Sequence, residues 1–562
     1  SSSACRSKCG ERMRVALCQI DATVGDLDGN AARIVEFAAR ARAQAAELAV
    51  FPELAICGYP PEDLLVRPSF LAAHDAALAA LARAVPPELP TRVGCVARNE
   101  TAATRGGRPL HNAVALLHGG AARIVATKTL LPTYDVFDES RYFEPNAAPE
   151  RNVVTIAGRR VGVVVCEDGW NDERFFGKRS YAVDPVERVV AAGAEMVVNL
   201  SASPWCVGKE AFRHRMVAAA SARHGVPMLY VNLVGGDVEL QFDGGSLAVK
   251  PTGIAAPPIA FAEALVVVDT DAPWTQAPSP IAVEAMQHAA IVQGIRGYVR
   301  KFGFRKVVVG LSGGIDSALV ATLAVDALGA ADVAGIGMPS THSSEHSVVD
   351  ARELAANLGI DFHLLPIASL QRAFAETLQP VFAGTPPGLA EENLQARMRG
   401  VLLMAFANKH GHLLLTTGNK SECAVGYCTI YGDTNGALAP IADLWKTEVW
   451  SLSRWLNRDG ARIPARSIEK PPSAELRPDQ LDTDSLPPYP VLDPVLRCLI
   501  EDDLSVAETA ARTGMPRAQV ADLFAKVQGS EWKRHQYPPT LRVSERCWSG
   551  RRMPVAHRYR ES

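Results

Sequence analysis

The sequence predicts an α/β protein with at least two domains. Short runs of β-branched and other apolar residues alternate with Ala-rich helical stretches along most of the chain. The 562 residues exceed what one hydrophobic core normally organises. Residues 269–280 are rich in proline and unlike either flank, so they predict a domain boundary. We expect a disordered leader or tag at residues 1–12, a first domain at 13–270, a linker at 271–285 and a second domain at 286–562.

Composition excludes several classes of protein. Lys and Arg number 58 against 61 Asp and Glu, and the net charge of −3 favours neither nucleic acid nor an anionic membrane as a partner. No apolar run approaches the roughly 18 residues that a membrane helix needs. The eleven cysteines are scattered and contain no CxxC pair. This pattern predicts a reducing, cytoplasmic setting rather than a disulfide scaffold or a zinc site.

Both halves show strand–helix alternation. In the first half we expect strands at residues 15–20, 48–51, 92–97, 114–117, 161–166, 196–200 and 228–232, and helices at 30–47, 69–84 and 211–224. In the second half we expect helices at 281–302 and 318–328, and strands at 307–309, 334–338, 362–366 and 412–416. The second pattern predicts a doubly wound parallel sheet, with its ligand at the carboxyl ends of the strands.

A glycine-containing loop joins strand 307–309 to helix 318–328. It reads Ser312-Gly-Gly-Ile-Asp-Ser317, with two glycines and two hydroxyls at the start of the helix. Backbone N–H groups in such a loop, together with the positive end of the helix, form a site for phosphate oxygens. The loop lacks the Gly-Lys-Ser/Thr ending of the Walker motif. It resembles the pyrophosphate-binding loop of enzymes that split ATP into AMP and pyrophosphate.

Three residues at or just past predicted strand ends indicate amide chemistry in the first half. Cys166 can attack an amide carbonyl if its proton is removed, Glu53 can take that proton, and Lys128 can offset nearby negative charge and stabilise the oxyanion. Taken singly, each has a structural alternative: Cys166 as a small buried apolar residue, and Glu53 or Lys128 as solvated loop charges.

The contexts of these residues resemble the Glu–Lys–Cys triad of the nitrilase superfamily. Residues 128–143, Lys-Thr-Leu-Leu-Pro-Thr-Tyr-Asp-Val-Phe-Asp-Glu-Ser-Arg-Tyr-Phe, resemble the glutaminase domain fused to NAD synthetases. The resemblance implies a four-layer α-β-β-α sandwich. It also implies a glutamine pocket formed by Tyr134, Glu139, Ser201, Ser203, Lys209 and Arg215.

The second half resembles the NAD synthetase family beyond its phosphate loop. The strings are Glu392-Asn-Leu-Gln-Ala-Arg-Met-Arg399 at a helix start, Thr416-Thr-Gly-Asn-Lys-Ser-Glu422, Gly426-Tyr-Cys-Thr-Ile-Tyr-Gly-Asp433 and Pro440-Ile-Ala-Asp-Leu-Trp-Lys446. Residues 531–539 resemble a further signature of the family. Residues 469–490 read as a long loop without secondary structure, which we interpret as a lid.

The resemblance implies particular ligand contacts. It assigns ATP to Ser312, Gly313, Gly314, Asp316, Ser317, Met338, Arg399, Thr417, Lys446 and Ser473, and Mg²⁺ to Asp316 and Glu422. It assigns the dinucleotide substrate, deamido-NAD⁺, to Asn393, Arg397, Glu422, Asp433 and Lys533. A surface ion pair is the alternative for Arg397, and a solvated basic face is the alternative for Lys533.

The implied activity is ATP-dependent synthesis of NAD⁺ from deamido-NAD⁺. The carboxylate is adenylated and then amidated with ammonia released from L-glutamine, which makes the chain a ligase that forms a C–N bond. We also expect a homo-oligomer. One alternative is another amidotransferase with the same loop, such as a GMP- or asparagine-synthetase-like ligase, but those carry unrelated glutaminase domains. A tRNA-thiolating enzyme would need a basic surface. A carrier or interaction module would have lost its catalytic positions, which are intact here.

Overall fold

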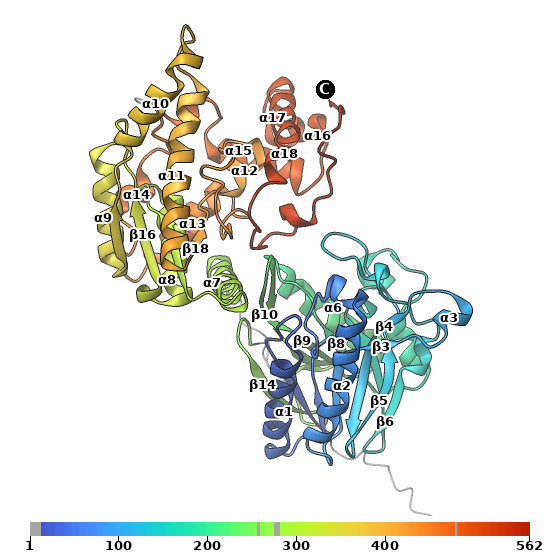
Figure 1. Cartoon of the computed structure of the whole chain (residues 1–562). Helices are drawn as coiled ribbons and strands as arrows, with labels where there is room; N and C mark the ends of the chain where they lie inside the picture. The colour runs from blue at the N-terminus through green and yellow to red at the C-terminus, as the bar shows by residue number, and fades with distance from the viewer. Residues whose placement is uncertain (1–12, 256–258, 275–280, 478–479, 562) are drawn as a thin grey trace, which may run out of the picture. The chain divides into compact units, whose positions relative to one another are not determined.

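The computed structural model describes residues 13–255, 259–274, 281–477 and 480–561. The expected leader at residues 1–12 lies outside the described residues. The chain divides into two compact units (Figure 1). The first comprises Ser1–Asp237 and Phe242–Pro280, and the second comprises Val238–Gln241 and Ile281–Ser562. In the part of the chain that the structure describes, no helix has the length and apolar character needed to cross a bilayer.

Two six-stranded sheets form the centre of the first unit. One has the order β14-β1-β2-β3-β4-β5 and the other β13-β12-β9-β8-β7-β6. The strands of the first sheet are β1 (Arg14–Gln19), β2 (Leu48–Val50), β3 (Thr91–Arg98), β4 (Leu110–His118), β5 (Ala121–Thr127) and β14 (Ala264–Asp269). Those of the second are β6 (Val153–Ile156), β7 (Arg159–Val165), β8 (Met196–Ser201), β9 (Met228–Asn232), β12 (Leu247–Lys250) and β13 (Gly253–Ala255). A two-stranded sheet pairs β10 (Val234–Asp237) with β11 (Leu240–Asp243).

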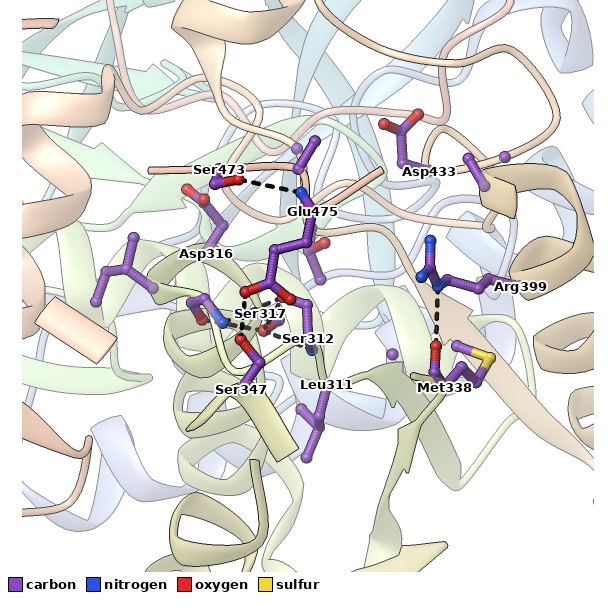
Figure 2. A pocket seen from close by; sticks show the side chains of 18 of the residues that line it. Leu311, Ser312, Asp316, Ser317, Met338, Ser347, Arg399, Asp433, Ser473 and Glu475 are labelled. Atoms are coloured by element: carbon purple, nitrogen blue, oxygen red, sulfur yellow. Dashed lines mark hydrogen bonds between the residues drawn. The ribbon is translucent and has the colours of Figure 1, made fainter. Parts of the chain in front are cut away.

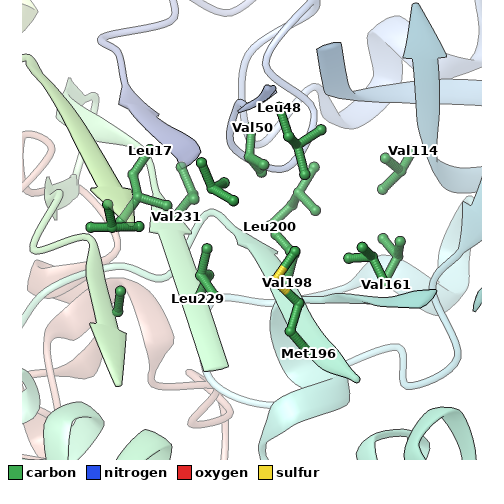
Figure 3. Close-up of a cluster of buried hydrophobic side chains, with 14 of the residues drawn as sticks. Leu17, Leu48, Val50, Val114, Val161, Met196, Val198, Leu200, Leu229 and Val231 are labelled. Carbon is green, nitrogen blue, oxygen red and sulfur yellow. The ribbon is translucent and has the colours of Figure 1, made fainter. Parts of the chain in front are cut away.

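Alternation along β1 shows how the layers form. Val15 and Leu17 belong to a core between the two sheets. Figure 3 shows Leu17 in this core together with Val161 from β7. Ala16 and Cys18 point the other way, toward helices α1 (Leu27–Ala43) and α2 (Pro68–Ala84). The outer face of the second sheet packs on α5 (Pro185–Ala191) and α6 (Lys209–His224). The four-layer α-β-β-α sandwich is therefore confirmed.

Several strands of the first unit escaped prediction because their sequences lack a clean period of two. Edge strand β5 is exposed over its first four residues, so it carries little apolar signal. Strands β12 and β13 are short and form an antiparallel hairpin. Cys166 was expected at the end of a strand, but β7 ends at Val165 and Cys166 begins the 3₁₀ helix η4 (Cys166–Gly169). A positive φ of 43° at Cys166 takes the backbone out of the extended conformation.

Part of the expected linker packs on the first unit. Trp274 is buried in the inter-sheet core, and its indole N–H donates to the Asp269 carbonyl at 2.8 Å. Lys250 Nζ lies 4.6 Å from the centre of the Trp274 ring. Residues 283–285, at the other end of the expected linker, begin helix α7 (Val283–Lys301).

A four-stranded parallel sheet forms the core of the second unit. Its order is β17-β16-β15-β18, so the chain moves outward from β15 (Lys306–Gly310) through β16 (Val333–Gly337) to β17 (Asp361–Leu364). β18 (His412–Leu415) then pairs with the opposite edge of β15. The doubly wound parallel sheet is confirmed, and its change of direction lies at the carboxyl ends of β15 and β18, where such sheets bind ligands.

Helices surround this sheet, and a helical cluster follows it. The helices are α8 (Ile315–Leu328), α9 (Glu345–Leu358), α10 (Ala368–Phe382), α11 (Leu389–His410), α12 (Lys420–Val425), α13 (Lys446–Leu456) and α14 (Ala465–Glu469). The cluster contains α15 (Tyr489–Ile500), α16 (Val506–Thr513), α17 (Arg517–Gly529) and α18 (Glu531–Arg534), with its own buried apolar core. The helix start expected at residues 392–399 lies one turn inside α11, which begins at Leu389.

Gly94 in β3 allows close passage of the loop that carries Glu53. A Cβ atom at this position would lie 2.2 Å from the Leu54 nitrogen and 2.4 Å from the Pro52 oxygen. We predict that Gly94→Ala lowers the free energy of unfolding by about 1–3 kcal/mol, the usual effect of overpacking. Thermal unfolding followed by circular dichroism measures the change.

Gly529→Ala serves as the control, because that position opens onto free space and has no strained φ. It should leave the melting temperature within a degree or two of wild type, on the scale of small helix-propensity effects. Equal melting temperatures for Gly94→Ala and wild type would mean that the 52–56 loop has room to move.

Candidate functional site

The first unit brings Glu53, Lys128, Glu139 and Cys166 together at the carboxyl ends of its strands. Glu53 follows β2, Lys128 directly follows β5, and Cys166 directly follows β7. Lys128 Nζ lies 2.8 Å from Glu53 Oε1 and 2.7 Å from Glu139 Oε1. The side chains of Lys128 and Glu53 are inaccessible to solvent, and Glu139 is buried. The lysine is therefore a buried cation between two buried carboxylates.

Hydrogen bonds orient both oxygens of Glu53. Asn112 Nδ2 donates to Oε1 at 2.7 Å, and the backbone N–H of Ala202 donates to Oε2 at 2.9 Å. Because donors hold each oxygen from a different element, the carboxylate is fixed in rotation as well as in position. Sequence reasoning missed Asn112, which sits inside β4 without any motif to mark it.

The charges of Lys128, Glu53 and Glu139 shift the pKa values of Lys128 and Glu139 and so determine whether these two groups carry a proton. Burial alone would lower the pKa of Lys128, but Glu139 and Glu53 together hold it well above its usual value. Burial raises the pKa of Glu139 to about 7, with Lys128 acting in the opposite direction. Tyr59 also donates to Glu139 Oε1, at 2.9 Å. The arrangement keeps the lysine charged and leaves the second glutamate able to gain a proton near neutrality.

Cys166 sits on a sharp turn between β7 and η4. Its thiol is free and buried, and burial raises its pKa well above that of an ordinary cysteine. The nearby charge of Glu53 raises the pKa further, whereas that of Lys128 lowers it. A resting thiol beside an oriented carboxylate suits proton transfer during attack, rather than a preformed thiolate.

Asp168 ties this turn to the segment that carries Lys128. Its Oδ2 accepts from the Val165 N–H at 3.0 Å, and its Oδ1 accepts from the N–H groups of Thr129 and Leu130 at 3.0 and 2.8 Å. Burial raises the pKa of Asp168 to about 7, although three backbone donors face its carboxylate. The cysteine turn and the lysine segment are thus bridged by one side chain.

The structure places the expected glutamine contacts in several different surroundings. Tyr134 and Tyr181 both donate to Glu167 Oε1, at 3.0 and 2.9 Å, and sequence reasoning missed Tyr181 and Glu167 as part of this group. Ser201 and Ser203 are buried at the end of β8. Lys209 lies over the Trp170 ring at 5.3 Å. Arg215 is exposed and contacts the Phe212 ring, which stacks on Trp170.

The second unit contains a cavity of about 320 Å³ at the carboxyl ends of its four strands (Figure 2). Its lining includes the ends of β15, β16, β17 and β18, as the sequence predicts for a ligand site. Eleven of the expected contacts line it: Ser312, Gly314, Asp316, Ser317, Met338, Arg399, Thr417, Glu422, Asp433, Lys446 and Ser473.

The loop at residues 312–317 opens into this cavity at the start of α8. Gly313 has a φ of +77°, and a Cβ atom there would lie 2.3 Å from the Ser347 oxygen, so the position requires glycine. The Gly314 N–H donates to Ser312 Oγ at 3.2 Å, and Ser317 Oγ donates to the Gly314 carbonyl at 3.0 Å. These bonds hold the turn in the shape that presents its backbone to an anion.

Two carboxylates converge on Lys446. Its ammonium bonds Asp316 Oδ2 and lies 3.3 Å from Glu422 Oε1. Asn419 Nδ2 donates to the other oxygen of Asp316 at 3.0 Å. Burial raises the pKa of Glu422 to about 8, with Lys446 opposing and Asp316 adding to the rise. Among the described residues, no three His, Cys, Asp or Glu side chains are grouped to hold a metal.

Four expected contacts lie outside the cavity lining and support residues within or beside it. Lys533 Nζ donates to the carbonyls of Gly426 and Cys428, each at 2.7 Å. Arg397 Nε donates to the Ile430 carbonyl at 3.2 Å, and Asn393 Oδ1 accepts from Thr429 Oγ1 at 2.7 Å. All three hold the segment at residues 426–433, whose last residue, Asp433, lines the cavity. Gly313 belongs to the 312–317 loop but does not line the cavity, and its carbonyl accepts from Ser467 Oγ at 3.0 Å.

The expected lid contributes one wall of the cavity. Residues 470–476 and Asp482 line it, and the segment is more ordered than its sequence predicts: it contains the 3₁₀ helix η6 (Asp482–Asp484), and α15 begins at Tyr489. Side-chain contacts, rather than local propensity, hold this segment. Glu475, which sequence reasoning missed, accepts from Ser347 Oγ at 2.7 Å near the start of α9 (Figure 2). It also accepts from Ser344 Oγ at 3.0 Å.

Comparisons with known families cover both units. The model of the carbon-nitrogen hydrolase family matches residues 14–278, and that of the NAD synthase family matches residues 287–537. A glutamine-dependent NAD(+) synthetase of Synechocystis sp. is 47% identical over 554 residues, which cover 97% of this chain and 99% of that protein.

Two solved structures resemble the chain over nearly its whole length. One is the glutamine-dependent NAD+ synthetase of Acinetobacter baumannii in complex with adenosine diphosphate. It is 35% identical, with a TM-score of 0.76 and coverage of 97% of this chain and 98% of that one. The glutamine-dependent NAD(+) synthetase of Cytophaga hutchinsonii has a TM-score of 0.82 over the same shares. Its identity is 22%, so it supports the fold alone.

Asp168→Asn tests the bridge between the cysteine turn and the lysine segment. An asparagine presents one acceptor and one donor group, so its NH₂ must face a backbone N–H that Asp168 now accepts. We predict a loss of about 1–3 kcal/mol in the free energy of unfolding, typical of an unsatisfied buried group. Urea unfolding measures it.

Asp138→Asn, a change of the same kind at an exposed position, is the control. It should leave stability unchanged. Equal midpoints for both variants and wild type would show that the three backbone bonds to Asp168 contribute little.

Proposed function

We propose that this chain, which belongs to the glutamine-dependent NAD(+) synthetase family, makes NAD⁺ from deamido-NAD⁺, ATP and L-glutamine. The observation that carries the proposal is the presence, on one chain, of a thiol beside a buried Glu–Lys–Glu cluster and of a cavity beside a phosphate-type loop. The first can release ammonia from an amide, and the second can activate a carboxylate to receive it. Formation of NAD⁺ and AMP from deamido-NAD⁺ and ATP, with glutamine or ammonium salts, tests the proposal directly.

The glutaminase reaction uses Cys166 as nucleophile. As Sγ bonds to the carboxamide carbon of glutamine, Glu53 accepts the thiol proton, and it returns that proton to the departing nitrogen when the C–N bond breaks. The products of this half-reaction are a γ-glutamyl thioester and ammonia. Glu53 then takes a proton from water as the water oxygen attacks the thioester carbon, and it passes that proton to sulfur when the C–S bond breaks, which releases glutamate and restores the thiol.

Lys128 makes this proton transfer possible. In the buried cluster, a proton moving onto Glu53 leaves negative charge on sulfur or on the carbonyl oxygen, and the Lys128 ammonium is the fixed cation that opposes it. Glu139 holds Lys128 from the other side, so that the lysine stays charged and in place. We assign Tyr134, Ser201, Ser203 and Lys209 to the glutamine pocket.

The synthetase reaction takes place in the cavity of the second unit. A carboxylate oxygen of deamido-NAD⁺ attacks the α-phosphorus of ATP, and pyrophosphate leaves. Ammonia then attacks the resulting acyl adenylate, and AMP departs as the amide forms. The 312–317 loop receives the pyrophosphate oxygens, Met338 is assigned to the adenine, and Lys446 and Arg399 offset phosphate charge.

Asp316 and Glu422 are the residues that would hold Mg²⁺. Both carboxylates converge on one cation position, now taken by the Lys446 ammonium, and Mg²⁺ sites commonly use one or two carboxylates together with substrate phosphates. The ion supplies neutralisation of the triphosphate when bound. Thr417 and Ser473 offer hydroxyls to ATP at the cavity wall.

The proposal also assigns the contacts to the dinucleotide, the bounds of the two domains and the cellular setting. Glu422 and Asp433 face deamido-NAD⁺, whereas Asn393, Arg397 and Lys533 act through the 426–433 segment that they hold. We assign residues 13–270 to the glutaminase and residues 286–562 to the synthetase. The chain would form a homo-oligomer and work in a reducing cytoplasm, and the free thiols of the described cysteines fit the second of these expectations.

Cys166→Ala should abolish NAD⁺ formation driven by glutamine and leave that driven by ammonium salts within about twofold of wild type, a change under 0.5 kcal/mol in barrier height. The reason is that no bond-making step of the synthetase needs this thiol. NAD⁺ production with each donor is measured in parallel.

Cys95→Ala removes a buried thiol from the α-helical side of the first sheet and is the matched control. It should keep both activities. If Cys166→Ala still made NAD⁺ with glutamine as donor, Cys166 could not be the nucleophile.

Asp316→Asn should stop synthesis with either nitrogen donor and spare glutamate release from glutamine. The change keeps side-chain volume and removes the anionic ligand that a metal–triphosphate complex needs. We expect a loss of at least about 100-fold in pyrophosphate release, by analogy with the loss of one strong transition-state contact.

Pyrophosphate release is measured at matched Mg²⁺, and glutamate release serves as the internal control. Unchanged pyrophosphate release would exclude Asp316 from the site.

A further inference from the structure

A buried asparagine lies behind the glutaminase site and holds the backbone of its 201–203 segment. Asn232 Oδ1 accepts from the Ser203 N–H at 2.8 Å, and Asn232 Nδ2 donates to the Ser203 carbonyl at 3.2 Å. Asn232 is fully buried, and Ser203 is nearly so. One side chain therefore satisfies both backbone groups of a residue expected to contact glutamine.

The position of Asn232 in the sheet explains this clamp. It is the last residue of β9 and pairs in parallel register with Ser201, the last residue of β8. Past this pair the two backbones share one more hydrogen bond, from the Leu233 N–H to the Ser201 carbonyl at 3.1 Å, and both strands end. The amide of Asn232 continues the ladder by one further pair of hydrogen bonds, so the 201–203 segment remains attached to the sheet after β8 has ended.

An ion pair sets the orientation of the Asn232 amide. Nδ2 lies 3.4 Å from Asp243 Oδ1, and Asp243 is held by Arg213 on α6 at 3.0 Å. Both charged side chains are completely buried. A carboxylate oxygen requires a donor opposite it, so the NH₂ group must face Asp243 and the oxygen is left for Ser203. Arg213 and Asp243 thereby select one of the two amide orientations.

The clamped segment also orients the proposed general base. The N–H of Ala202, between Ser201 and Ser203, donates to Glu53 Oε2 at 2.9 Å. Lys128 and Asn112 both bond the other oxygen, Oε1. The Ala202 N–H thus orients Oε2, and the position of this N–H depends on how firmly the neighbouring Ser203 is held.

We propose that Asn232 is a positioning residue of the glutaminase, which acts through the 201–203 segment on Glu53 and on bound glutamine. Arg213 and Asp243 keep its amide in the required orientation. The proposal rests on the proposed function, since it assumes that Glu53 and Cys166 hydrolyse glutamine. It adds that the base is held from a distance by the end of β9.

Asn232→Asp in the full-length chain tests the proposal. The change preserves size but removes the donor to the Ser203 carbonyl and places a carboxylate oxygen against Asp243. A 1 Å shift of a catalytic group can reduce a rate by about 100-fold, and we expect a loss of that order in glutamine-driven kcat/KM, with a higher KM for glutamine. Ammonium-driven NAD⁺ formation should stay at the wild-type level.

Asn457→Asp is the matched control. Asn457 lies in the second unit, outside the cavity lining, and its amide clamps the backbone N–H and carbonyl of Ile463, at 3.0 and 2.7 Å, in the same manner. It should lower the melting temperature to a similar degree and leave the KM for glutamine unchanged. Asn232→Ala, which adds no carboxylate, replaces Asn232→Asp in the assay if the latter does not fold.

The outcomes separate the two proposals. Wild-type protein that releases no glutamate from glutamine would overturn the proposed function itself. If wild type hydrolyses glutamine and the Asn232 variant shows the same glutamine-driven activity, only the positioning role would be overturned. Equal losses of glutamine-driven activity in the Asn457 and Asn232 variants would do the same, because they would reflect stability rather than geometry.

Discussion

The buried contact of Lys128 with Glu53 and Glu139 is the constraint on which the first unit depends. A charge removed from water is tolerated only where partners and hydrogen bonds replace its hydration, and removal of one partner from such a pair typically costs about 3–5 kcal/mol. Lys128 must therefore be delivered to one point together with two carboxylates. β2 and β5 deliver two of the three groups, and the four-layer sandwich fixes where those strands end. The fold and the proposed chemistry thus share one requirement.

The second unit meets the same requirement in another way. Lys446 begins α13 and reaches the carboxylates of Asp316 in α8 and Glu422 in α12. Asn419, the N-cap of α12, bonds both the helix and Asp316. In each unit, one lysine forms ion pairs with two carboxylates from different parts of the chain and so holds those parts together. The difference lies in access: the first cluster is sealed from solvent, whereas the second borders a cavity that can admit a nucleotide.

Most of the fold, and the residues at strand ends, could be predicted because local sequence carries that information. The apolar run before Cys166, the turn chemistry of the 312–317 loop and the proline-rich boundary all act within a few residues. Residues that orient the sites could not be found in this way. Asn112 meets Glu53 across 59 positions of sequence, and Asn232 meets Ser203 across 29. Such pairs exist only because strands far apart in the chain become neighbours, and a single asparagine in a strand has no local signature. The order of the 470–476 segment was missed for the same reason, since Glu475 bonds Ser347 at a separation of 128 residues.

The positive φ of Cys166 has a consequence for substitution at this position. A side chain in the left-handed region costs about 1–3 kcal/mol relative to a relaxed backbone, and glycine escapes most of that strain. Position 166 is therefore one where the residue that best serves folding differs from the residue that can attack a carbonyl. Replacement by glycine would relieve this strain and remove the proposed nucleophile, so backbone stability and the proposed reaction make opposite demands on this one position.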